Sequence, residues 1–112
     1  DAISAGINPK NVTFYLQSRI SEIHEMYTLF QSLITVARLE RIPSLKDMAR
    51  DAKIEMNFEL LGYPILQAAD ILCVRANIVP VGKDNMAHVE VTREIARRFN
   101  ILPDRTRNQD LC

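Results

Sequence analysis

Only two short segments of this sequence have the pattern of a β-strand, and their scarcity limits the folds open to the chain. VTFYLQ, residues 12–17, is rich in β-branched and aromatic residues, and NIVPVG, residues 77–82, is a short apolar run. Strands joined by helices favour a parallel α/β sheet, yet two strands do not make a stable one. We therefore expect further strands to come from sequence outside these 112 residues or from another chain.

The first half of the chain predicts two helices. Apolar residues recur at helical spacing after Ser21, which is a suitable N-cap, and Pro43 is expected to end this first, long helix. Ser44, with Asp47 three residues later, resembles a capping box. This pair predicts that a second helix starts within SLKDMARDAK.

The second half of the chain predicts two more helices. Gly62 is expected to break the helical pattern, and Pro64 can then occupy the first turn of a third helix, ILQAADILC. The last helix is predicted from Asp84 to about residue 100, followed by a polar tail. The sequence thus predicts one partial α/β domain over residues 1–112, mostly helical within these residues.

Composition argues against several classes of protein. The 14 basic and 14 acidic residues cancel, so the chain has no strong electrostatic footprint for nucleic acid. No apolar run approaches the roughly 18 residues that a membrane span needs. Cys73 and Cys112 make a poor disulfide framework, which indicates a reducing, cytoplasmic setting. The opening residues DAISAGINPK lack an initiator Met and a signal-peptide pattern, which predicts a processed or excised piece.

Gln67 and Asp70 interrupt an otherwise apolar helical segment, residues 64–74. Three residues apart, they lie on one helical face, and a carboxylate there is costly unless it is paired. Asp70 could pair with Arg75, with Arg19 or with a cap elsewhere. Alternatively, both side chains point into a pocket and receive hydrogen bonds from a ligand.

The junction after residue 82 is a second candidate site. Gly82 would let the backbone turn and approach a ligand closely at the end of the second strand, where open α/β sheets bind ligands. Asp84 can cap the last helix, and the free amides of its first turn can meet an anion. The alternative is that Asp84 is only an N-cap and Asn85 is exposed.

The two histidines and Cys73 are weaker candidates for chemistry. His88 lies four residues after Asp84, a spacing that can share a metal, but no third ligand is evident and a hydrogen-bonded histidine is the more common outcome. His24 is expected on a solvated helix face. Cys73 is too apolar in context for a nucleophile. The sequence has no Walker phosphate loop, no Gly-x-Gly-x-x-Gly fingerprint and no Gly-x-Ser-x-Gly elbow.

Three consecutive motifs together resemble a known family. They are YPILQAADIL, VPVGKDNMAH and TREIARRFN, all within residues 63–100. They closely resemble the middle of tryptophanyl-tRNA synthetases, which are class I aminoacyl-tRNA synthetases of the tyrosine and tryptophan subgroup. GINPKNVTFYLQS and the helix ending in ARLERI resemble the segment just upstream, so the resemblance covers about residues 6–100. Residues 101–112 depart from the family as a divergent tail.

The resemblance implies a Rossmann-type catalytic domain in a cytoplasmic homodimer. It implies that the complete enzyme activates L-tryptophan with ATP and Mg²⁺ and transfers it to tRNA(Trp). Asp70 would accept the indole N–H. The other implied substrate-binding residues would shape the side-chain pocket (Gln67, Ile71, Val79, Val81) or meet the ammonium and the adenylate region (Gly82, Asp84, Asn85).

Some features depart from that family pattern. Gln is more usual than Asn85, and Gln67 is often Met. Gln-x-x-Asp also resembles tyrosyl-tRNA synthetases, although the VPVGKD and RFN segments favour tryptophan. The His-x-Gly-His-type and Lys-Met-Ser-Lys-Ser-type signatures are not among these residues, so we expect no catalytic residue, no metal site and no tightly bound cofactor in this segment, and no adenylation by it alone. A non-catalytic interaction module with the same fold is a further alternative.

Overall fold

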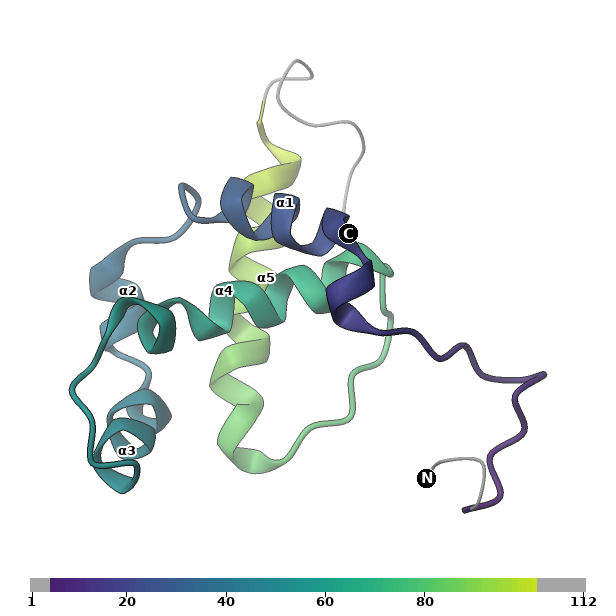
Figure 1. The fold of residues 1–112 in the computed structure, drawn as a ribbon. Coiled ribbons are helices and arrows are strands. Elements are labelled where there is room, and N and C mark those ends of the chain that lie inside the picture. The colour runs from purple at the N-terminus through teal and green to yellow at the C-terminus, as the bar shows by residue number, and fades with distance from the viewer. Residues whose placement is uncertain (1–4, 103–112) are drawn as a thin grey trace.

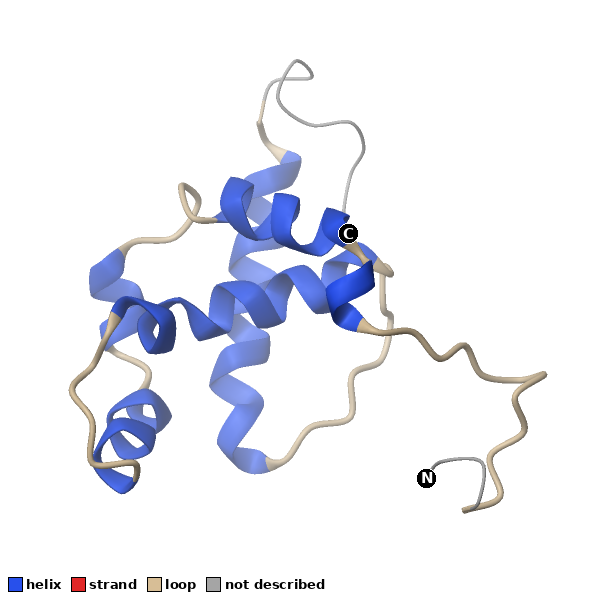
Figure 2. Cartoon of the chain, viewed as in Figure 1, coloured by secondary structure: helices blue, strands red, loops and turns tan. Residues whose placement is uncertain are grey.

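The computed structural model describes residues 5–102, and every regular element in that range is helical (Figure 2). In chain order the elements are a 3-10 helix η1 (Gln17–Arg19), α1 (Ser21–Phe30), α2 (Val36–Glu40), α3 (Pro43–Asp51), α4 (Phe58–Cys73), a second 3-10 helix η2 (Lys83–Asn85) and α5 (Met86–Asn100). The prediction of a mostly helical segment is confirmed for this range. Almost all of the divergent tail, including Cys112, lies outside the described residues.

Neither predicted strand forms within residues 5–102. Residues 12–16 and 77–82 lie in no helix and belong to no ladder, although Leu16 and Gly82 have extended backbone angles. A strand needs a neighbour to satisfy its N–H and C=O groups, and the helices of this range offer none. Both segments therefore expose apolar side chains, with Leu16 66% and Ile78 86% exposed. The predicted strands are thus not shown by residues 5–102, because the pattern marks residues suited to a sheet without supplying the rest of it.

α4 is the central helix, and it packs against both α1 and α5 (Figure 1). The predicted break at Gly62 is wrong, because this residue lies buried inside α4. A Cβ at that position would come within 2.7 Å of the Tyr27 hydroxyl oxygen, so glycine allows α1 to approach α4 closely. Pro64 lies in the interior of α4 rather than in a first turn, and Asn57 caps the helix through a 2.8 Å bond from the Leu60 N–H.

The first long predicted helix is in fact two helices. α1 ends at Phe30, and α2 starts again after Thr35, whose hydroxyl accepts a hydrogen bond from the Arg38 N–H at 3.1 Å. Leu33 and Ile34 lie buried in the intervening turn. Because both residues are apolar and buried, they continued the helical pattern of the sequence although the turn is not helical. Arg98 of α5 donates a 2.6 Å hydrogen bond to the Leu33 carbonyl and satisfies this turn.

The predicted helix caps need correction as well. The residues at the N-cap positions of α1 and α3 are Ile20 and Ile42, neither of which has a capping side chain. Pro43 starts α3 rather than ending the previous helix, a position that suits its fixed φ and missing N–H. Ser44 is therefore free of capping, and its hydroxyl is used elsewhere.

The core joins residues from all the α-helices. α1 and α5 meet through an edge-to-face contact of Phe30 with Phe99, with ring centroids 5.8 Å apart. α2 and α5 are joined by Arg38 and Glu94, with N···O distances of 3.0–3.1 Å. The radius of gyration is 15.5 Å, against about 13 Å expected for a closed domain of this length, because the N-terminal segment extends away from the helices (Figure 1).

Candidate active-site segment

A hydrogen-bonded chain of three side chains crosses the core between α3, α4 and α5. His88 of α5 is buried, and its Nε2 lies 2.8 Å from the hydroxyl oxygen of Ser44 in α3. Its Nδ1 lies 2.9 Å from Oε1 of Gln67 in α4. The ring also meets Tyr63 edge to face at 5.7 Å. We call these three hydrogen-bonded residues the Ser44–His88–Gln67 chain.

The contacts of His88 define its protonation. With Gln67 Oε1 turned toward the ring, Nδ1 carries the proton and donates it to this oxygen. Burial lowers the pKa of His88, so the ring is neutral near pH 7 and its Nε2 accepts from the Ser44 hydroxyl. Both ring nitrogens are thus engaged, which argues against the metal shared with Asp84. Within residues 5–102 no group of three His, Cys, Asp or Glu side chains is arranged to hold a metal ion.

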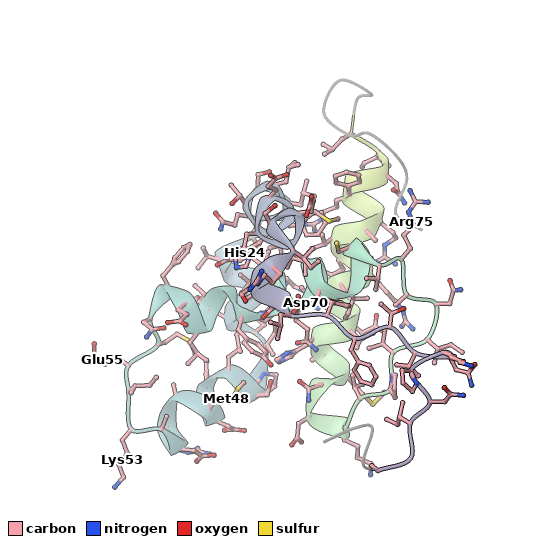
Figure 3. The ribbon with its side chains drawn as sticks, turned by 45° about the vertical axis from the view of Figure 1, so that its right-hand side comes forward. His24, Met48, Lys53, Glu55, Asp70 and Arg75 are labelled. Atoms are coloured by element: carbon pink, nitrogen blue, oxygen red, sulfur yellow. The ribbon has the colours of Figure 1, made fainter. Side chains whose placement is uncertain are left out.

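Asp70 has a partner that the sequence did not indicate. Gln17 Nε2 lies 2.7 and 2.8 Å from the two carboxylate oxygens of Asp70 and donates to them. Neither Arg19 nor Arg75 pairs with it, and Figure 3 shows Asp70 on α4 with Arg75 well apart from it. A carboxylate can accept about four hydrogen bonds, so the two contacts from the Gln17 amide leave Asp70 able to accept from another donor.

The two halves of the predicted pocket lie in different surroundings. Gln67 and Asp70 are half-buried on neighbouring turns of α4, as their spacing predicted. Ile71 and Val79 line a groove of about 750 Å³ between the end of α4 and α5. Val81 lies at the exposed junction that precedes η2.

The junction residues are placed but not gathered around a site in the described chain. Gly82 has φ −73°, which any residue adopts, and a Cβ there would meet nothing within 4 Å. The prediction that its freedom is needed for a turn is therefore wrong, because the 3-10 turn of η2 redirects the chain. Asp84 is exposed and caps no helix, and Asn85 is half-buried at the start of α5 without a capping side-chain bond.

Sequence reasoning missed Gln17 and Ser44 as members of these polar groups. Gln17 lies 53 residues from Asp70 in the sequence, and its strand-like surroundings gave no reason to expect it there. The sequence pattern predicted Ser44 as a helix cap, whereas its hydroxyl contacts His88. His24 is exposed on α1, as expected (Figure 3).

The comparison with protein families identifies the class of protein. Residues 1–108 match the family described as tRNA synthetases class I (W and Y), and the chain belongs to that family.

Relatives of this chain come from the tryptophan branch of the family. The chain is 56% identical over 103 residues to the tryptophan–tRNA ligase of Treponema pallidum, covering 91% of this chain and 31% of that protein. It is 54% identical to the tryptophan–tRNA ligase of Borreliella burgdorferi, covering 91% and 29%. The chain therefore spans about a third of the length of these relatives.

A solved structure supports the same assignment. The crystal structure of tryptophanyl-tRNA synthetase from Campylobacter jejuni complexed with ADP and tryptophan superposes with a TM-score of 0.82. It is 41% identical and covers 88% of this chain and 30% of that one. The fold of the chain is thus that of part of a class I synthetase catalytic domain. None of the helices in residues 5–102 has the length and apolarity to cross a membrane.

Proposed function

We propose that this chain is the amino-acid-recognition segment of a tryptophan–tRNA ligase. In the complete enzyme, L-tryptophan reacts with ATP to give tryptophanyl-adenylate and pyrophosphate, and the tryptophanyl group then passes to tRNA(Trp). The names of the relatives favour tryptophan over tyrosine, the alternative that Gln67 and Asp70 left open. This segment supplies binding, and the groups that stabilise the transferring phosphate come from other parts of the enzyme.

The observation that carries the proposal is the environment of Asp70. Its carboxylate is half-buried on α4 and one turn from Gln67, and within residues 5–102 its only side-chain partner is the neutral Gln17 amide. An indole presents one N–H donor. A ligand without such a donor would leave the buried acceptor unpaired, so the acceptor discriminates strongly against that ligand. We assign Asp70 to the indole N–H. We propose that the walls of the pocket are formed by Gln67, Ile71, Val79 and Val81. We propose that the polar end of the substrate is bound by Gly82, Asp84 and Asn85.

The complete enzyme also explains the exposed apolar segments. We propose that residues 12–17 and 77–82 are strands of its Rossmann-type parallel sheet, which would cover Leu16 and Ile78. We further propose a cytoplasmic homodimer, and the free thiol of Cys73 agrees with a reducing compartment.

Substitution of Asp70 in the complete enzyme tests this assignment. Loss of a charged acceptor for a substrate N–H is worth roughly 1.5–3 kcal/mol, so Asp70→Ala should lower kcat/KM for tryptophan by on the order of 10- to 100-fold in ATP–pyrophosphate exchange. Asp47→Ala is the matched control, because this carboxylate is exposed on α3 and pairs with Arg50. Unchanged selectivity for tryptophan in Asp70→Ala would refute the role of this carboxylate.

A further inference from the structure

The Ser44–His88–Gln67 chain fixes the orientation of an amide that belongs to the candidate pocket. A glutamine side chain can turn its carbonyl oxygen or its NH₂ group toward a given neighbour. Here Oε1 faces the Nδ1–H of His88 at 2.9 Å. The opposite orientation requires the other ring tautomer, in which Nε2–H donates to the Ser44 hydroxyl and Nδ1 accepts from the NH₂ group of Gln67.

The amide nitrogen of Gln67 is consequently left for another partner. It donates no hydrogen bond to any side chain or backbone group in residues 5–102. No buried side-chain nitrogen or oxygen in that range lacks a partner, so this nitrogen reaches solvent. α4 thus presents two different groups on one face: an N–H donor at Gln67 and a carboxylate acceptor at Asp70, one turn further along.

We propose that Ser44 and His88 are positioning residues that hold Gln67 as a hydrogen-bond donor toward an oxygen acceptor of the bound amino acid or its adenylate. The Ser44 hydroxyl donates to Nε2, which keeps the proton of the neutral ring on Nδ1, and Nδ1–H in turn keeps Gln67 Oε1 turned inward. This inference rests on the proposed function and deepens it, because Gln67 then donates a hydrogen bond to the substrate in addition to lining its pocket.

Two amide substitutions of His88 separate positioning from packing. In His88→Asn the amide nitrogen takes the place of Nδ1 and can still donate to Gln67, whereas in His88→Gln the amide takes the place of Nε2 and faces Ser44. In ATP–pyrophosphate exchange by the complete enzyme, His88→Gln should raise KM for tryptophan about three- to tenfold, the loss expected from one neutral hydrogen bond. His88→Asn should rescue most of that loss, and thermal unfolding of both variants reports any loss of folding.

The background variant Gln67→Met makes the test specific. If His88 acts through Gln67, then His88→Gln and His88→Asn have equal KM values in the Gln67→Met background. A threefold or greater difference that persists there would overturn the proposal, as would equal KM values in the Gln67 background.

The tautomer of His88 gives a readout that does not depend on activity. In the complete enzyme labelled with ¹⁵N-histidine, and assigned with His88→Asn, the proton should reside on Nδ1. A proton on Nε2 would overturn the proposal, because Gln67 would then donate to His88 and face the ligand with its oxygen. A wild-type enzyme without tryptophan-dependent exchange would instead refute the proposed function, and the tautomer would still decide the positioning.

Discussion

The close approach of Gly62 to Tyr27 predicts how Gly62→Ala changes the free energy of unfolding. The sign of this change depends on the hydroxyl oxygen of Tyr27. In Gly62→Ala the new Cβ would lie 2.7 Å from the Tyr27 hydroxyl oxygen, while the next nearest atom, Cζ of the same ring, lies at 3.6 Å. Overpacking of this kind costs about 1–3 kcal/mol, against a gain of up to about 1 kcal/mol from replacing glycine inside a helix. Gly62→Ala should therefore lower the free energy of unfolding by about 1 kcal/mol.

Removing the hydroxyl should reverse that effect. In a Tyr27→Phe background the nearest atom is at ordinary van der Waals distance, so Gly62→Ala should raise the free energy of unfolding by about 0.5–1 kcal/mol. Urea denaturation of the 112-residue chain and its variants measures this. Gly82→Ala is the control, since nothing lies within 4 Å of its Cβ, and its effect should be the same in both backgrounds. The same sign in both backgrounds would refute the close-approach argument.

Three other predictions concern stability. Burial lowers the pKa of His88 below the 6.5 of an unfolded histidine, so its neutral form contributes fully above about pH 6.5 and the stability falls as pH drops below that value, by at most about 1.4 kcal/mol per pH unit. His88→Asn should remove this component from urea unfolding measured between pH 5 and 8, and an unchanged slope would contradict it. A double-mutant cycle of Arg38→Gln and Glu94→Gln should give a coupling free energy of about 0.5–1 kcal/mol at low salt, which decreases in high salt. Zero coupling would show that the ion pair contributes nothing to stability. Lys53 adopts φ +56° after α3, so Lys53→Gly should stabilise the chain by a few tenths to about 1 kcal/mol in the same urea assay, with destabilisation counting against the left-handed conformation.

Helical periodicity in the sequence predicted the helices better than their ends. The spacing behind α1, α3 and α5 is visible in the sequence because each buries one face. The helix break predicted from glycine and proline was wrong, since Gly62 and Pro64 lie inside α4. There, packing against α1 outweighs the local preference of these residues. The strand-like segments also failed, because a strand depends on neighbours that residues 5–102 do not include.

The candidate site shows the same division between local and long-range information. The shared face of Gln67 and Asp70 follows from a spacing of three residues, so the sequence predicted it. Their hydrogen-bond partners, Gln17 and His88, come from distant segments that only the tertiary fold brings close. The hydrogen-bonded state of His88 was the expected outcome, but no pattern indicated Ser44 as its second partner.

Amino-acid-dependent ATP–pyrophosphate exchange tests the central claim most directly. The complete protein and the 112-residue chain should be assayed side by side, with tryptophan and with tyrosine. We expect exchange by the complete protein with tryptophan only, and none by the 112-residue chain. Exchange with tyrosine in preference to tryptophan, or none with either amino acid, would contradict a tryptophan-recognition segment built around Asp70.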